Sequence, residues 1–217
     1  MKRLTKPHKP LIYIFCEGES EQQYADFLHQ NFNDVAVLKR VNKTGLFDFA
    51  ADKFAKDVKY RNNLPVTDEI WFFFDVEEFD RDKWGERFQI IKKLRRLRRN
   101  PPIRVRLLMT TACVEYWFLL HYQKVSPVIA TPAEKTRILH QLQNFVPDYR
   151  KGSKDPIWAI GKQYPTALQN GAQILTSLQS EGLPTLDDTD ERNQWLVRCG
   201  KTFSTVQEAI TYLESLA

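Results

Sequence analysis

Two acidic stretches hold the side chains best suited to chemistry in this sequence, because each follows a run of apolar residues. The two runs cover residues 11–16 and 70–74. The carboxylates after them are Glu17, Glu19 and Glu21 in the first stretch, and Asp75, Glu77, Glu78 and Asp80 in the second. Carboxylate oxygens are the ligands that hard divalent cations such as Mg²⁺ prefer. The two stretches therefore predict a metal site.

The spacing of these carboxylates selects four of them as a metal shell. Residues two apart in an extended segment point the same way, so Asp75 and Glu77 can face one ligand. A turn after Glu17 can fold Glu21 back beside it. Like charges repel and raise one another's pKa, so a cation is expected between them. Two ions about 4 Å apart could hold a phosphodiester during its hydrolysis. The alternative is that each acidic turn only complements a helix dipole.

Three further carboxylates form a second tier of candidates, which are Glu19, Glu78 and Glu115. Glu115 is the lone acid in the aromatic and aliphatic segment 112–122. A buried carboxylate needs a partner or a metal, so Glu115 is a candidate ligand, or a residue that orients the ligands. The alternative is that it lies on the polar face of a helix, paired with an arginine.

Basic side chains are concentrated in residues 92–99 of a chain whose net charge is +5. The predicted nucleic-acid contacts are Lys92, Arg95, Arg96 and Arg99 in this segment, and Lys151 and Lys154 in the basic loop 149–154. A stripe of cations can neutralise phosphates, which makes binding sensitive to salt. Alternatively, 92–99 is a solvated helix face or binds an acidic protein, and the loop is a solvated linker.

The order of the predicted elements indicates an α/β fold. Strands are expected at residues 11–16, 35–41, 70–76 and 103–109, with helices between them at 20–32, 46–60 and 84–99. Alternation of this kind is typical of a mainly parallel, Rossmann-like sheet flanked by helices. Further helices are expected at 113–122, 132–145, 156–180 and 204–216. We therefore predict an α/β core over residues 1–125 and a helical C-terminal part over 126–217, packed on the core.

The composition excludes several other classes of protein. No run approaches the roughly 20 apolar residues that a membrane span needs, and the run 11–16 is too short for a secretory signal. Three cysteines are too few and too scattered for a disulfide scaffold. No GxxxxGK[ST] motif is present, which argues against ATP hydrolysis by a phosphate-binding loop. A cytoplasmic protein without membrane contact is expected.

These motifs together resemble a known family. Residues 14–21 resemble the EGxxE opening of Toprim domains in the OLD and RloB groups, and 73–77 resemble their later DxD strand end. Residues 112–122 are similar to the CFELWLLLHF-like helix of RloB-like proteins, and 149–152 resemble that family's tyrosine-lysine-glycine loop. The chain departs from the pattern at Glu77, which replaces an aspartate, and at residues 111–112, where the family has Asn-Pro.

The resemblance implies a Toprim-type core, with Mg²⁺- or Mn²⁺-dependent phosphodiester chemistry and two ions. Glu17 would be the acid/base and metal glutamate, Glu21 the second EGxxE glutamate, and Asp75 and Glu77 the DxD ligands. Catalytic roles would thus fall on Glu17, Asp75 and Glu77. RloB-like proteins are thought to act in bacterial antiphage defence by abortive infection, often beside an ATPase partner.

The function expected is that of a metal-dependent nuclease, a hydrolase that cleaves DNA or RNA. Two alternatives belong to other classes. One is a non-catalytic nucleic-acid-binding or sensing subunit that docks on a partner ATPase and needs no divalent ion. The other is an enzyme that uses the same carboxylates on a small phosphate compound.

Overall fold

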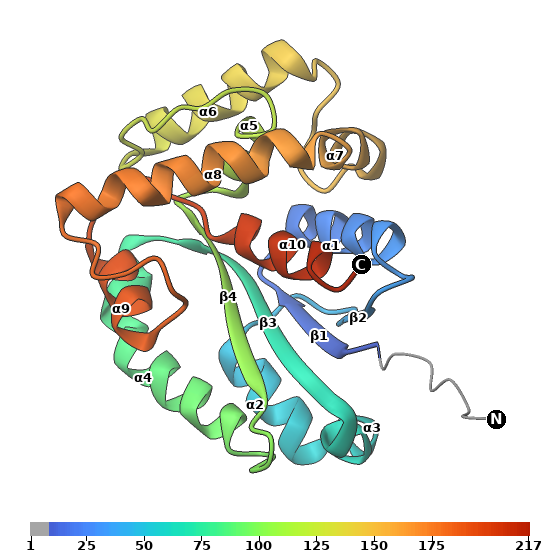
Figure 1. Cartoon of the computed structure of the whole chain (residues 1–217). Coiled ribbons are helices and arrows are strands. Elements are labelled where there is room, and N and C mark those ends of the chain that lie inside the picture. Colours follow the sequence, from blue (N-terminus) through green and yellow to red (C-terminus); the bar gives the residue numbers. More distant parts are fainter. Residues whose placement is uncertain (1–8) are drawn as a thin grey trace.

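The computed structural model describes residues 9–217, and a four-stranded parallel sheet lies at its centre (Figure 1). The strands are β1 (Leu11–Cys16), β2 (Val37–Arg40), β3 (Thr67–Val76) and β4 (Arg104–Thr111). Their order in the sheet is β2-β1-β3-β4, and every neighbouring pair is parallel. The predicted parallel α/β fold is confirmed, although β2 is shorter than expected.

Helices cover both faces of this sheet. The helices before β4 are α1 (Glu19–Asn31), α2 (Phe47–Lys56), α3 (Val58–Asn63) and α4 (Glu78–Arg95). Those after it are α5 (Val114–Leu119), α6 (Pro132–Phe145), α7 (Lys154–Gly161), α8 (Tyr164–Leu178), α9 (Asp190–Arg198) and α10 (Val206–Glu214). Two short 3-10 helices lie at Leu64–Val66 and Gln179–Glu181. In Figure 1, α5, α6, α7 and α8 lie beyond the carboxyl ends of the strands.

The side chains of β1 show why the sheet needs cover on both faces. All six residues of the strand are buried, as the continuous apolar run predicts. Alternate side chains point to opposite faces, so Ile12 and Ile14 join one core and Tyr13 and Phe15 the other. The first core includes α1, α5, α7 and α10, and the second includes α2, α4 and α9.

Several helix boundaries differ from the predicted ones for local reasons. The expected helix 46–60 divides at Asp57, whose side chain accepts a hydrogen bond from the Lys59 N–H and begins α3. The expected helix 156–180 divides before Tyr164, since Pro165 suits only the first turn of a helix. Helix α9 was not predicted, because its sequence is mostly polar.

Two other helices differ in extent from the predicted ones. Helix α4 begins at Glu78, six residues before the expected start at Trp84, because the carboxylate of Asp80 accepts a hydrogen bond from the Glu77 N–H at 2.6 Å. Helix α5 covers only six residues of the expected 113–122.

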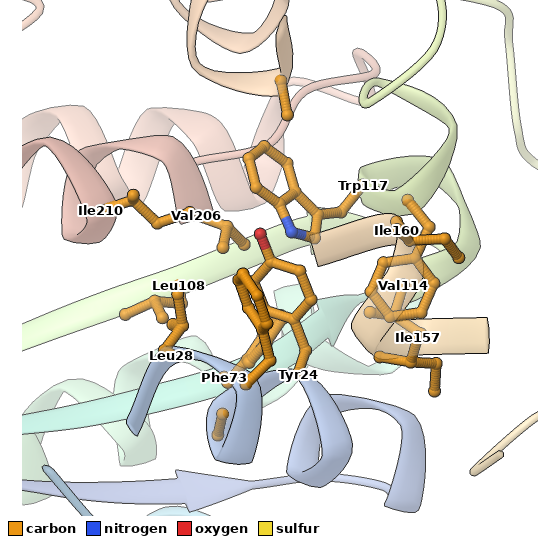
Figure 2. Close-up of a cluster of buried hydrophobic side chains, with 14 of the residues drawn as sticks. Tyr24, Leu28, Phe73, Leu108, Val114, Trp117, Ile157, Ile160, Val206 and Ile210 are labelled. Carbon is orange, nitrogen blue, oxygen red and sulfur yellow. The ribbon is translucent and has the colours of Figure 1, made fainter. Parts of the chain in front are cut away.

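The C-terminal half packs on the sheet through the first core (Figure 2). Trp117 of α5 is fully buried, and its ring lies edge-on to that of Tyr24 from α1, with centroids 6.0 Å apart. Tyr24 in turn contacts Phe73 of β3. Ile157 of α7 and Ile210 of α10 belong to the same core. Helices from the C-terminal half thus contribute to the first core. The division into a core and a C-terminal part at residue 125 stays a prediction.

No helix within residues 9–217 combines the length and the apolar character that crossing a bilayer requires.

Replacing Trp117 by alanine should destabilise the protein by about 3–5 kcal/mol, because the indole leaves a cavity between α1, α5 and β3. Urea unfolding followed by circular dichroism measures the change. The matched control is Val128→Ala, since Val128 is 72% exposed and should change stability by less than about 0.5 kcal/mol. Equal effects of the two substitutions would contradict this description of the core.

Candidate metal centre

The first two carboxylates meet because β1 and β3 end side by side. Cys16 pairs with Phe73 in the sheet, and the Glu17 N–H donates to the carbonyl oxygen of Phe73 at 3.0 Å. The chain then brings Glu17 Oε2 to 2.9 Å from the backbone nitrogen of Asp75. The expected meeting of these two residues at the carboxyl edge of the sheet is therefore seen.

Glu21 reaches the same place from the first turn of α1. Gly18 is the N-cap residue of this helix. A Cβ atom on Gly18 would lie 2.8 Å from Glu21 Oε2, so glycine leaves room for this carboxylate to fold back. Glu17, Glu21 and Asp75 each offer a carboxylate oxygen, and these atoms lie within 4.8 Å of one another. We refer to these three residues as the carboxylate cluster.

Burial and mutual repulsion raise the pKa of all three carboxyl groups. Burial raises the pKa of Glu21 to about 7, and the charges of Glu17 and Glu115 add to the rise. Burial, followed by the charges of Glu21 and Glu17, holds the pKa of Asp75 well above its usual range. Partial burial also raises the pKa of Glu17, against the opposing hydrogen bond from the Asp75 N–H. The nearby cations Arg87 and Lys151 therefore offset these rises only in part.

Asp75 carries an oxygen that points to a missing ligand. Its Oδ1 atom is buried, and no donor among residues 9–217 forms a hydrogen bond with it. Buried polar atoms are nearly always satisfied, so an unsatisfied carboxylate oxygen beside two other carboxylates fits a bound cation. A divalent ion at this point would satisfy Asp75 Oδ1 and separate the repelling charges.

Glu115 completes the wall of a cavity of about 310 Å³ that includes the cluster. It is only 2% exposed, and its Oε1 accepts a hydrogen bond from the Tyr149 hydroxyl at 2.8 Å. Lys151 Nζ lies 3.7 Å from the same oxygen. Glu115 is thus buried and contacts a tyrosine and a lysine. It is not paired with an arginine on an open helix face.

The loop 149–152 is docked on α1 and is not a solvated linker. The Gly152 N–H donates to Ser20 Oγ at 3.0 Å. Gly152 has a φ of +72°, and a Cβ there would lie 2.7 Å from Glu19 Oε2, so both its conformation and its contact favour glycine. Glu19 and Lys151 also line the cavity. Lys154 does not, since its ammonium lies over the ring of Trp158.

The structure does not bring Glu77 into the cluster. Its carboxylate pairs with Lys135 of α6, while its N–H begins α4. Glu78 lies in the first turn of α4 and is exposed. For these two residues the helix-dipole interpretation accounts for the acidic turn better than the metal interpretation. Glu77 still lies close enough for its charge to raise the pKa of Asp75.

The basic end of α4 lies far from the carboxylates. This helix of 18 residues is about 27 Å long and begins beside the cluster, so its last turn lies near the amino ends of the strands. There, Arg98 donates to the carbonyl oxygen of Pro65 just before β3. Arg95 forms two hydrogen bonds with Asp190, and Lys92 lies over the Phe88 ring. Of the four predicted nucleic-acid contacts in this segment, Arg96 and Arg99 are the exposed ones.

The fold and the cluster together define a class, namely parallel α/β proteins with an acidic centre at the carboxyl edge of the sheet. A sequence model of RloB-like proteins matches residues 12–213. The chain therefore belongs to the RloB-like family. No curated protein and no solved structure matches the chain. The family match includes all residues that line the carboxylate cavity.

Two contacts in the centre were missed by the sequence analysis. One is the hydrogen bond from Tyr149 to Glu115, and the other is the anchoring of Gly152 by Ser20. Both join segments that are far apart in the chain, so no local pattern marks them. A glycine next to Lys151 in a basic loop was the one available signal for a close approach.

The raised pKa of Glu21 predicts how the metal-free protein responds to pH. A carboxyl group that holds its proton more tightly when folded destabilises the folded state as pH rises from about 4.5 to about 7. A shift of this size corresponds to at most roughly 3 kcal/mol. Glu21→Gln should remove much of this loss, and should therefore be more stable than the wild type at pH 8.

Urea unfolding at pH 5 and pH 8 in EDTA checks this prediction. Glu78→Gln is the control, because its exposed carboxylate lies outside the cavity. An unchanged pH dependence in Glu21→Gln would show that Glu21 is not protonated in the folded protein near neutral pH.

Proposed function

We propose that this protein is a divalent-metal-dependent nuclease with a Toprim-like core, whose centre is the carboxylate cluster. The observation that carries the proposal is the convergence of Glu17, Glu21 and Asp75 within 4.8 Å, with Asp75 Oδ1 buried and unsatisfied. A purely structural role does not account for three neighbouring carboxylates whose pKa values are all raised.

The donor set fits a hard cation. All three groups are carboxylates, which favour Mg²⁺ or Mn²⁺ over softer metals. One such ion, or two, would polarise a phosphoryl oxygen and make bound water more acidic. Glu17, Glu21 and Asp75 would hold the first ion. Glu115, which lines the same cavity, is a candidate ligand for a second ion.

The other residues of the cavity have roles that follow from their contacts. Glu17 is the most exposed carboxylate of the cluster, and its raised pKa makes it a stronger proton acceptor than an ordinary carboxylate. Lys151 supplies a positive charge beside Glu115, where it can contact an anionic substrate. Tyr149 holds Glu115 in place through its hydroxyl.

The choice of a nucleic acid as substrate rests on charge and on family membership. The chain carries a net charge of +5 despite its acidic centre, which favours a polyanion. The resemblance to RloB-like proteins extends the proposal to antiphage defence by abortive infection together with an ATPase partner. The substrate would be DNA or RNA.

Asp75→Asn should abolish measurable Mn²⁺ binding in calorimetry, because it removes the charge of the ligand whose Oδ1 is buried and unsatisfied. The same substitution should leave the metal-free protein as stable as the wild type or more so, since it removes an uncompensated buried carboxylate. Glu78→Gln is the control and should bind Mn²⁺ normally. Normal Mn²⁺ binding by Asp75→Asn would contradict the proposed centre.

Glu17→Gln should lower Mg²⁺-dependent cleavage of nucleic acid by at least about 100-fold, as expected for the loss of a ligand. The assay uses plasmid DNA, single-stranded DNA and tRNA, with the ATPase encoded beside the gene added where one is found. Glu77→Gln should reduce cleavage less than Glu17→Gln, because its carboxylate pairs with Lys135. No cleavage of any of these substrates, together with no binding of Mg²⁺ or Mn²⁺, would favour the sensing subunit instead.

A further inference from the structure

A second concave surface lies along the free edge of the sheet, beside β2. It has a volume of about 620 Å³, against 310 Å³ for the carboxylate cavity. Residues of β2, α2 and α3 line it together with Asp26 and His29 of α1. We refer to this surface as the edge groove.

The edge groove is strongly basic. Its cations are Lys39, Arg40, Lys43, Lys53 and Lys59, and its only acidic residues are Asp26 and Asp57. Arg40 pairs with Asp26 at 2.6 Å, and Lys53 with Asp57 at 3.3 Å. This pairing leaves three lysines, Lys39, Lys43 and Lys59, with no carboxylate partner in the part of the chain that the structure describes. The groove is therefore suited to an anion with several charges.

The three lysines come from three separate segments. Lys39 belongs to β2, Lys43 to the loop after it, and Lys59 to the first turn of α3. A lysine on an edge strand can simply prevent pairing with another chain, but this explains only Lys39. The convergence of the other two on the same hollow needs a further reason, and an extended polyanion provides one.

Aromatic rings line the groove between these cations. Phe49 is partly exposed, and the ammonium of Lys53 lies 5.5 Å from its ring centroid. Lys39 lies 5.7 Å from the ring centroid of Tyr13 in the same wall. Basic grooves with an accessible aromatic ring are typical of surfaces that bind single-stranded nucleic acid, where phosphates contact cations and bases stack on rings.

The loop after β2 and helix α1 border both the edge groove and the carboxylate cluster. The loop that carries Lys43 continues to Gly45, whose N–H donates to the carbonyl oxygen of Cys16 at 3.0 Å. Cys16 directly precedes Glu17. Helix α1 likewise joins the two sites, since it carries Glu21 at its start and Asp26 in the wall of the groove. A strand lying in the groove would therefore be directed towards the metal centre.

We infer that the edge groove binds the backbone of a single-stranded nucleic acid and guides it to the carboxylate cluster, an inference that rests on the proposed function. Phosphates contact the three unpaired lysines, and one base stacks on Phe49. A double helix should bind less well, because its bases are stacked inside the duplex and cannot stack on the Phe49 ring. The substrate class is thus single-stranded DNA or RNA, including the unpaired loops of a folded RNA.

Fluorescence anisotropy with labelled 12-nucleotide oligo-dT and oligo-U, and with a 12-base-pair duplex, tests this inference. EDTA is present, so that binding is measured without cleavage. The groove variant carries Lys39→Gln, Lys43→Gln and Lys59→Gln. The matched control carries Lys93→Gln, Lys162→Gln and Arg198→Gln, which removes the same charge from three exposed residues outside both the edge groove and the carboxylate cavity. Thermal melts establish that both variants fold, and a Lys43→Gln, Lys59→Gln variant replaces the first if it does not.

The groove variant should bind single strands about tenfold more weakly, and the slope of log K against log salt should shrink by about 2, the value for three lost phosphate contacts. The control should stay within about twofold of the wild type. Tighter binding of oligo-U than of oligo-dT would assign the site to RNA, and the reverse to DNA.

Four outcomes would each overturn the inference. They are equal losses in the two variants, a larger loss in the control variant, preference for the duplex, and no binding by the wild type. Failure here is separate from failure of the proposed function. The groove variant keeps Glu17, Glu21 and Asp75, so calorimetric Mn²⁺ binding tests the metal centre independently.

Discussion

The repulsion among three partly or fully buried carboxylates is the constraint on which this structure depends. Glu17, Glu21 and Asp75 lie within 4.8 Å of one another, so at neutral pH they must either hold protons or share a cation. The raised pKa values of Glu21 and Asp75 favour the first solution in the metal-free protein. Proton release and cation binding are coupled, because an ion can bind only as the protons leave.

The surrounding scaffold holds this unfavourable arrangement in place. Two adjacent parallel strands bring Glu17 and Asp75 together, and a glycine cap allows Glu21 to fold back. The loop 149–152 then closes the cavity by docking on α1, and Tyr149 fixes Glu115. The large core shared by α1, α5, α7 and α10 stabilises these positions. Stability from the core thus offsets the destabilising centre, a common relation in functional sites.

The sequence was enough to predict the part of the site that depends on local rules. Glu17 and Asp75 follow buried apolar strands, and parallel strands end at one edge, so their meeting was predictable. Glu77 was misplaced because the start of α4 depends on a capping contact with Asp80, which competes with the strand-end interpretation. Strands β1 and β3 were found for the same reason as the carboxylates, since continuous apolar runs mark them. The contact of Tyr149 with Glu115 depends on how distant helices pack, and the sequence carries no local signal for it.

The most direct test of the central claim is anomalous X-ray scattering from crystals of the protein soaked in Mn²⁺. The account predicts an anomalous peak within about 2.5 Å of carboxylate oxygens from Glu17, Glu21 and Asp75, with Asp75 Oδ1 among the ligands. Crystals of similar quality that show no peak in this cavity, or a peak only elsewhere on the surface, would contradict it.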